Sequence, residues 1–196
     1  MLAAPLLGGC IVTRTVVHDL ALEGVRLPTR EERARIREDP MSRSWDSGVI
    51  VLLSTRRDLR QETARRNSGF QMTVALCEGR VHLPDTGTRG PFLYNAGLWD
   101  AAGRLGVSAT QDDVAPAPGG RYVYWLPLSM RTRANVSYDR TGTVTSFFPD
   151  HDLRQDGGDI CVYGRGARML GVIWLTNTVV IPDAAIRAAL GQPVPR

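Results

Sequence analysis

The chain has 196 residues, which is enough for one domain with a substantial hydrophobic core or at most two small ones. All 24 of its Lys and Arg residues are arginine, against 20 acidic residues, so the formal net charge is only +4. This mild excess is spread along the chain without a basic tail, which argues against a nucleic-acid partner. It is compatible with anionic lipid head groups or an acidic protein partner.

The chain opens with a short apolar run, residues 1–6, followed by Leu7-Gly8-Gly9-Cys10. This tetrapeptide resembles a bacterial lipobox, where a signal peptide is cut just before a cysteine that carries lipid. The small Gly8 and Gly9 would let a lipid-modifying enzyme reach the thiol, and the run is too short to span a membrane. The resemblance implies a signal peptide over 1–9 and a single periplasmic β-rich domain over 10–196, anchored by lipid at Cys10. The alternative is an apolar N-terminus with a chance Gly-Gly-Cys.

The signal could be incomplete, because no positive charge precedes its apolar run. A start codon assigned too late or a truncated sequence would explain this. Residue 11 is isoleucine, and in lipoproteins of the enterobacterial type the absence of aspartate there implies transfer to the outer membrane. The resemblance therefore places the protein on the periplasmic face of the outer membrane.

Cysteine usage agrees with export. With Cys10 assigned to lipid, Cys77 and Cys161 remain, and two cysteines in an oxidising compartment commonly form a disulfide. Closing so long a loop is expected to contribute about 4 to 5 kcal/mol in the chain-entropy account. The alternative is two buried free thiols, since free cysteine is among the most buried residue types.

The first structured elements are expected to be a strand, a surface helix and a buried strand. Residues 11–17 are rich in Val and Thr, as strands prefer. Thr29-Arg30-Glu31-Glu32 fits a capping box, and the helix after it should end before Asp39-Pro40. With Ile36 as its only large apolar residue, this helix has little to bury and is expected to be solvated. The continuous apolar run 49–53 predicts a strand buried on both faces.

An arginine-rich segment follows. Five arginines lie within residues 56–66, namely Arg56, Arg57, Arg60, Arg65 and Arg66. Such a segment could dock an acidic protein partner or lipid phosphates. The alternative is a charged connection that is simply kept in water.

The middle of the chain contains further strand patterns. Residues 70–77 alternate in polarity, which predicts a half-buried strand. Residues 121–128 form an aromatic-rich strand, whose Tyr and Trp would be interface anchors if exposed and core if buried. Residues 136–138 and 143–148 resemble a hairpin. Residues 98–105 fit either a helical turn or an irregular segment.

A loop rich in carboxylates lies between these strands and the tail. Its weak metal candidates are Asp150, Asp152, Asp156 and Asp159. Oxygen-rich loops bind calcium when their ligands converge, but the spacing does not match the twelve-residue calcium loop. Turn chemistry is the alternative, and we expect no metal and no cofactor. Residues 160–163 should form a strand that carries Cys161 to Cys77.

The tail gives the clearest fold signal. Residues 170–181 predict one long apolar strand, and Pro182 and Gly191 then mark the first position and the end of a helix. The apolar stripe of this helix consists of Ala185, Ile186, Ala189 and Leu190. The elements together predict a mainly β fold, an antiparallel β-sandwich-like domain with a short N-terminal surface helix and a C-terminal helix.

The lipobox, the strand-rich domain and the closing run from Gly158 to Leu190 resemble small periplasmic lipoproteins associated with type VI secretion, especially immunity lipoproteins. Such immunity proteins bind and block a toxin delivered into the periplasm. The resemblance thus implies a lipid-anchored protein-binding module, and it transfers no contact residues. A structural lipoprotein of an envelope or secretion complex is the second hypothesis.

A hydrolase is the third hypothesis. The sequence lacks the nucleophile-elbow, zinc-protease, paired Cys-x-x-Cys and phosphate-loop motifs. Its histidines, His18, His82 and His151, have no partner at a diagnostic spacing. Catalytic triads are defined by geometry rather than by sequence, so these absences disfavour an enzyme without excluding one.

Overall fold

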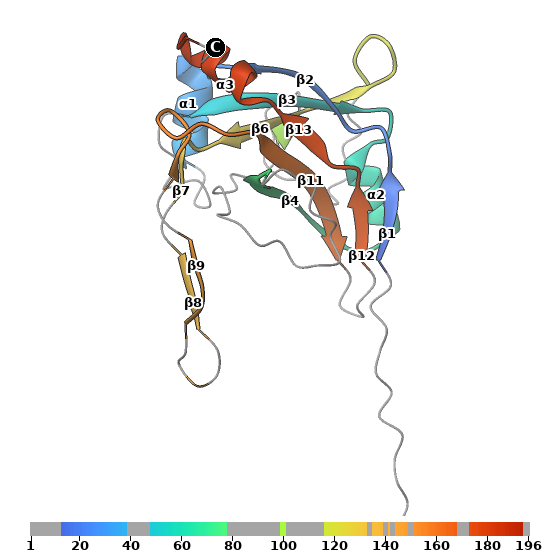
Figure 1. Ribbon diagram of the computed structural model, residues 1–196. Helices are drawn as coiled ribbons and strands as arrows, with labels where there is room; N and C mark the ends of the chain where they lie inside the picture. Colours follow the sequence, from blue (N-terminus) through green and yellow to red (C-terminus); the bar gives the residue numbers. More distant parts are fainter. Residues whose placement is uncertain are drawn as a thin grey trace, which may run out of the picture.

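A computed structural model of the chain describes residues 13–38, 48–77, 99–100, 116–132, 135–138, 141, 144–148, 151–167 and 173–193. This part is mainly β, as predicted, with three helices (Figure 1). The longer strands are β1 (Thr13–Val17), β2 (Ala21–Arg26), β3 (Val49–Thr55), β4 (Gly69–Leu76), β6 (Tyr122–Leu128), β9 (Val144–Phe148) and β11 (Ile160–Ala167). The shorter strands are β5 (Trp99–Asp100), β7 (Arg131–Thr132), β8 (Asn135–Tyr138), β10 (His151–Asp152), β12 (Ile173–Thr176) and β13 (Val179–Ile181). The helices are α1 (Arg30–Glu38), α2 (Leu59–Arg65) and α3 (Asp183–Leu190).

The first sheet, here the disulfide sheet, is built around β11. Strand β4 pairs antiparallel with the whole of β11, while β12 and β13 pair with its other edge one after the other. The register slips by one residue between them, because Arg165 faces Leu175 whereas Val162 faces Val179. The prediction of one long strand over 170–181 was therefore wrong: the chain forms two strands in line, separated by a bulge.

Strand β1 extends the disulfide sheet beyond β12, and it runs parallel to β12. A parallel pair cannot be joined by a tight turn. Here nearly the whole domain separates the two strands in sequence, so one parallel pair lies within an otherwise antiparallel sheet.

The second sheet has the order β2-β3-β6-β5 and is antiparallel throughout. Its central strand β3 is covered on both faces, as predicted. Val49, Val51 and Leu53 belong to the main core, whereas Ile50 belongs to a second, smaller cluster on the opposite face. Strand β6 pairs along the full length of β3 and contributes Leu126 to the main core.

The main core lies between the two sheets and under α3. It joins Val51 of β3, Val74 of β4 and Val162 of β11 to Ile186 of α3. Three residues of the predicted apolar stripe of α3 contact this core: Ile186 is buried, and Ala189 and Leu190 pack against the same cluster, whereas Ala185 is only partly buried. The helix begins after Pro182, which is the N-cap rather than the first helical residue, and it ends at Gly191 in the left-handed conformation, φ 69°.

Helix α1 begins with the predicted capping box. The Thr29 N–H donates to Glu32 Oε2 at 2.8 Å, and the Glu32 N–H donates to Thr29 Oγ1 at 3.2 Å. The helix is nevertheless not simply a solvated element: Ile36 is fully buried against Ile50, with Leu52 and Trp125 packed beside them. A single apolar side chain is enough to attach α1, because the outer face of β3 presents Ile50, which Ile36 covers.

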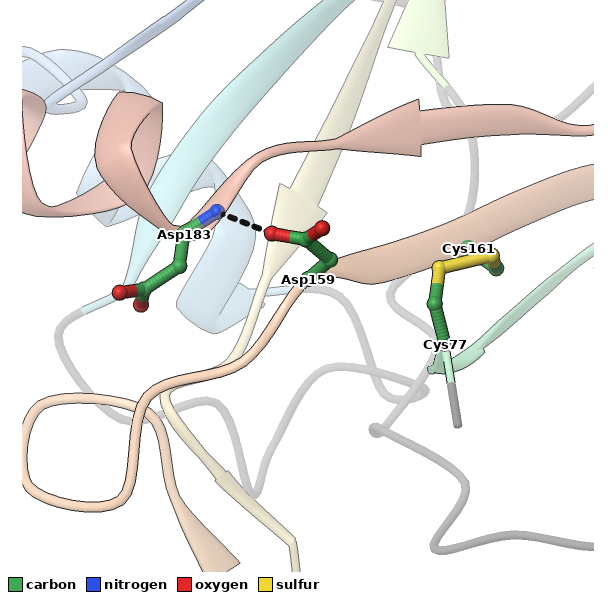
Figure 2. The surroundings of a disulfide bond; sticks show 4 residues. All are labelled: Cys77, Asp159, Cys161 and Asp183. Atoms are coloured by element: carbon green, nitrogen blue, oxygen red, sulfur yellow. Dashed lines mark hydrogen bonds between the residues drawn. A yellow bond between two sulfur atoms is a disulfide. The ribbon is translucent and has the colours of Figure 1, made fainter. Parts of the chain in front are cut away.

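The predicted disulfide is present. Cys77 and Cys161, 84 residues apart, are bonded with their Cα atoms 5.2 Å apart (Figure 2). The Cys77 N–H donates to the Asp159 carbonyl at 2.8 Å, so pairing of β4 with β11 continues up to the bridge. The predicted hairpin is present too, as β8 and β9 pair antiparallel.

None of the helices in the described part of the chain is long and apolar enough to cross a membrane.

Candidate interaction surface

The carboxylate loop does not form a metal centre in the described residues. Asp152 accepts hydrogen bonds from the Arg154 guanidinium at 2.9 Å, and these bonds, with the Arg131 charge nearby, lower the pKa of Asp152. Asp156 accepts the Asp152 N–H at 2.8 Å, and Asp159 accepts the Asp183 N–H at the start of α3 at 2.9 Å (Figure 2). Each carboxylate thus serves a protein donor, and no three His, Cys, Asp or Glu side chains of the described ranges converge on one point. Asp150 lies outside these ranges.

The arginine-rich segment contains helix α2, which neither interpretation of the sequence anticipated. The helix begins at the N-cap Asp58, whose side chain accepts the Arg60 N–H at 2.8 Å. Leu59 and Thr63 are buried, and the Thr63 hydroxyl donates to the Leu59 carbonyl at 2.6 Å. Only one large apolar residue of the helix faces the core, so its sequence carried no helical periodicity.

The five arginines of this segment do not form one surface. Arg60 is only 6% exposed and lies inside the fold. Arg66 pairs with Glu62 at 3.2 Å, and its guanidinium lies over the Trp174 ring at 5.9 Å. Arg57 pairs with Glu62 at 3.1 Å while its side chain remains 54% exposed.

Arg56 and Arg65 are exposed. The segment therefore presents Arg56 and Arg57 before the start of α2 and Arg65 at its end, about 10 Å apart along a helix of this length.

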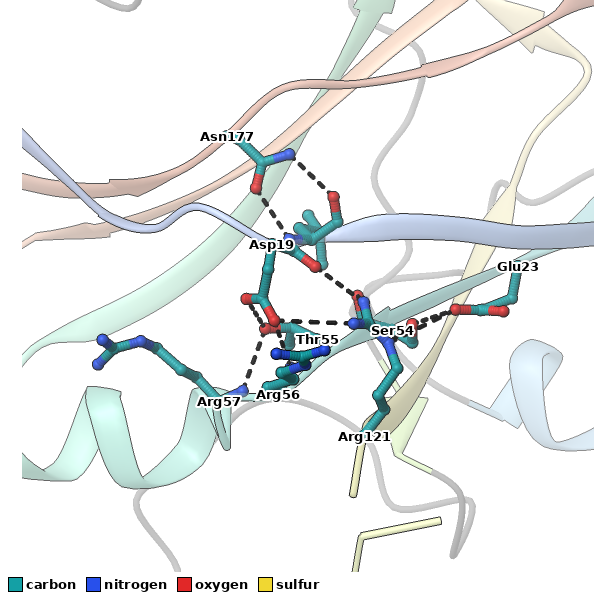
Figure 3. Close-up of polar contacts among 9 residues, drawn as sticks. Asp19, Glu23, Ser54, Thr55, Arg56, Arg57, Arg121 and Asn177 are labelled. Carbon is teal, nitrogen blue, oxygen red and sulfur yellow. Dashed lines mark hydrogen bonds and ion pairs between the residues drawn. The ribbon is translucent and has the colours of Figure 1, made fainter. Parts of the chain in front are cut away.

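Arg56 and Arg57 lie next to a polar cluster that connects the two sheets (Figure 3). Asp19 accepts hydrogen bonds from the Thr55 hydroxyl at 2.7 Å and from the Arg56 N–H at 2.8 Å. Arg121 donates from Nε to Ser54 Oγ at 2.7 Å and from Nη2 to the Asp19 carbonyl at 2.8 Å. Burial would raise the pKa of Asp19, but the bonds from Thr55 and Arg56 and the Arg121 charge outweigh it and lower this pKa.

The cluster continues to the bulge of the disulfide sheet. The Asn177 side chain donates to the Leu20 carbonyl at 2.8 Å and accepts the Leu20 N–H at 2.9 Å. It thereby replaces a strand partner at the point where the chain leaves β1 for β2. The Arg56 backbone is thus fixed to a rigid junction between the sheets.

The polar cluster does not offer a nucleophile. Ser54 donates to Glu23 Oε1 and accepts from Arg121, which is a chemically plausible activation. However, Ser54 is 1% exposed, so no substrate reaches its hydroxyl in this conformation. The geometry is that of a structural junction.

A second basic group lies at the end of the disulfide sheet where β1 begins. We call Arg14, Arg65 and Arg165 the basic end. Arg14 faces Trp174 across β1 and β12, and Arg165 faces Leu175 on the next row. Arg65 precedes Arg66, whose guanidinium stacks over Trp174.

All three arginines of the basic end are exposed. Residues 13–15, 64–71, 164–167 and 173–175, which make up this end in the described structure, contain no Asp or Glu. The sequence interpretation missed Arg14 and Arg165, because only the strand register brings them near Arg65.

Cys10 lies outside the described residues, and so its lipidation stays a prediction. The chain matches no protein-family model, no curated protein and no solved structure at a significant level.

Proposed function

We propose that the protein is a lipid-anchored binding module of the periplasm, and that it acts as an immunity protein that blocks a secreted toxin by direct contact. The observation that carries this proposal is the disulfide between Cys77 and Cys161. Structural disulfides are typical of oxidising compartments, which supports export. The bridge also uses two of the three cysteines in the chain, and the remaining one is Cys10, directly after Gly8-Gly9.

The contact surface that we propose for the partner is formed by Arg56 and Arg57. Both side chains are exposed, and the backbone N–H of Arg56 is fixed by Asp19 at 2.8 Å. A guanidinium can bind a carboxylate through two parallel hydrogen bonds, and a rigid support lowers the entropy lost on binding. The proposed partner is therefore acidic at its contact site. Arg60 is excluded because it is buried.

Blocking by contact needs no covalent step, so the module requires only affinity and position. Lipid on Cys10 would hold it at the membrane where a toxin arrives, and arginine pairs would speed association with an acidic surface. The Arg57 pair with Glu62 supports this role, because Glu62 holds one guanidinium nitrogen at 3.1 Å while over half of the side chain stays accessible.

The anchor is tested by growing cells with radioactive palmitate and isolating the full chain, compared with Cys10→Ser. We expect label in the wild-type protein and none in the variant. A Cys77→Ser/Cys161→Ser variant is the control, because it removes two cysteines without touching the lipobox. An unlabelled wild-type protein, expressed from its true start codon, would remove the anchor.

The partner surface is tested by capture of the lipidated full chain with its bound proteins. Arg56→Glu/Arg57→Glu should lose a stoichiometric partner, whereas Arg30→Glu/Arg35→Glu on α1 should retain it. Recovery of envelope components instead of a toxin would favour a structural lipoprotein. Equal recovery of the partner with both variants would show that the contact lies elsewhere on the domain.

A further inference from the structure

The start of β1 fixes which end of the domain would face a bilayer. Only Ile11 and Val12 separate Cys10 from Thr13, the first residue of β1. Three residue steps span at most about 11 Å even when fully extended. A lipid on Cys10 would therefore hold the beginning of β1 within about 11 Å of the head groups, comparable to the Debye length of about 8 Å at physiological salt.

The beginnings of β1, β4 and β12 and the end of β11 lie together at the same end of the molecule (Figure 1). This part also contains the end of α2, because the guanidinium of its C-cap residue Arg66 lies over the Trp174 ring at 5.9 Å. The basic end is thus the part of the described structure closest to the attachment point.

The chemistry of this end suits an anionic surface. The residues that form it in the described structure carry four arginines and no carboxylate of their own. Arg66 is already paired with Glu62 at 3.2 Å, which leaves Arg14, Arg65 and Arg165. Arginine binds phosphate through two parallel hydrogen bonds and is less strongly hydrated than lysine. Arg14 and Arg165 lie on opposite faces of the sheet at the same end of its strands. Side chains that surround the attachment point in this way match a layer of phospholipid phosphates better than a single acidic protein patch.

We propose that the basic end binds the phosphates of anionic phospholipids and orients the domain on the membrane, with Arg14, Arg65 and Arg165 as the contact residues. This inference rests on the proposed lipid anchor at Cys10. It assigns Arg65 to lipid and leaves Arg56 and Arg57, before the start of α2, for the protein partner. Helix α2 separates the two sites, since Arg56 and Arg57 precede it and Arg65 ends it.

Arginine footprinting tests the orientation. The lipidated full chain is reconstituted into vesicles of phosphatidylcholine, either alone or with about one third phosphatidylglycerol, and is treated with phenylglyoxal. The chain contains no lysine, so modification reports on arginine, and mass spectrometry reads each site. In the anionic vesicles the three arginines of the basic end should react about fivefold more slowly, the factor that corresponds to about 1 kcal/mol per arginine near an anionic surface.

The internal control is α1, whose exposed Arg30, Arg33 and Arg35 lie at another side of the domain and should react equally in both vesicles (Figure 1). High salt should abolish the protection, since the Debye length falls to about 3 Å at 1 M.

The same sample separates the two possible failures. An unmodified Cys10 in the mass spectrum overturns the anchor and the orientation together. Acylated, vesicle-bound protein whose basic end reacts equally in both vesicles overturns the orientation alone. Protection by a captured protein partner, but not by anionic lipid, would assign this end to protein recognition and likewise overturn the proposal.

Discussion

Two groups of arginines in the described part of the chain differ in ways that the composition does not show. In one group each guanidinium meets a carboxylate: Arg26 lies 2.6 Å from Glu32, Arg187 lies 2.6 Å from Asp183, and Arg121 lies 3.7 Å from Glu23. In the other group, the basic end, the described residues supply no carboxylate to Arg14 or Arg165. Together with burial, the difference separates charges that hold the fold together from charges that remain available to a ligand. Arg57 meets Glu62 but is 54% exposed, and so it remains available.

Burial explains how the two groups arise. The side chains of Arg26, Arg121 and Arg187 are 34%, 28% and 13% exposed, so each has lost part of its hydration. A partly desolvated charge is stable only with a partner, whereas an exposed one needs none. Substitutions should therefore affect stability in the first group and binding in the second.

The largest effect is expected for Arg121→Ala. The change leaves Asp19 and Glu23 without their shared cation and removes the donor to Ser54 Oγ, which lies 2.7 Å from Arg121 Nε. We expect a loss of about 2 to 3 kcal/mol in the free energy of unfolding, measured by urea denaturation. Arg56→Ala is the matched control, because this neighbour uses only its backbone in the junction. A loss below about 1 kcal/mol would show that the junction does not depend on the charge.

An intermediate effect is expected for Glu32→Gln. Hydrogen bonds from Arg26 lower the pKa of Glu32 from 4.5 to about 2, against the opposing effect of burial. The folded pKa lies below the unfolded one, so the stabilisation is complete above about pH 4.5 and is lost as the pH falls towards 2. Because Arg26 is one-third exposed, screening reduces the contribution to about 1 to 2 kcal/mol.

Urea denaturation of Glu32→Gln between pH 7 and pH 2.5 checks this expectation. The variant should be less stable than the wild type at pH 7 and should approach it at the acidic end. Glu31→Gln, with a side chain 75% exposed, is the control and should follow the wild type across the range. A constant difference between Glu32→Gln and the wild type at all pH values would contradict the shifted pKa.

Local signals predicted the paired group only in part. The capping box of Thr29 and Glu32 could be found in the sequence, because both partners lie within one helical turn. The Arg26 contribution to Glu32 could not, since it depends on how β2 meets α1. Arg121, which contacts Ser54 from 67 residues away, carried no local signal at all.

The strands could be predicted from local sequence patterns, whereas the bulge could not. Alternation and apolar runs identified β3, β4, β6 and β11, since these patterns follow from burial on one or two faces. The break at Asn177 within residues 170–181 comes from a tertiary contact, the pair of hydrogen bonds between Asn177 and Leu20. A polar residue inside an apolar run was its only sign in the sequence.

The smallest effect on stability is expected for the combined variant Arg14→Gln/Arg65→Gln/Arg165→Gln. The described structure gives the side chains of Arg14 and Arg165 no hydrogen bond or ion pair, and the Arg65 side chain only a 3.4 Å contact with Gln61. Besides this long, exposed contact, the favourable interaction lost is that of Arg65 with the C-terminal dipole of α2, about 0.3 to 0.5 kcal/mol. Relief of repulsion among like charges offsets part of that loss.

The net change in the free energy of unfolding should therefore stay within about 0.5 kcal/mol, measured by urea denaturation beside Arg121→Ala. In a Cys10→Ser background, where no lipid holds the chain, the same variant should co-sediment with anionic vesicles no better than with neutral ones, because a guanidinium that stabilises no carboxylate of its own chain remains free to bind phosphate. A loss of more than about 1 kcal/mol would place these arginines in the structural group and contradict the division between the two. A stable variant that still distinguishes the two vesicle types would keep the division but assign lipid binding to other residues.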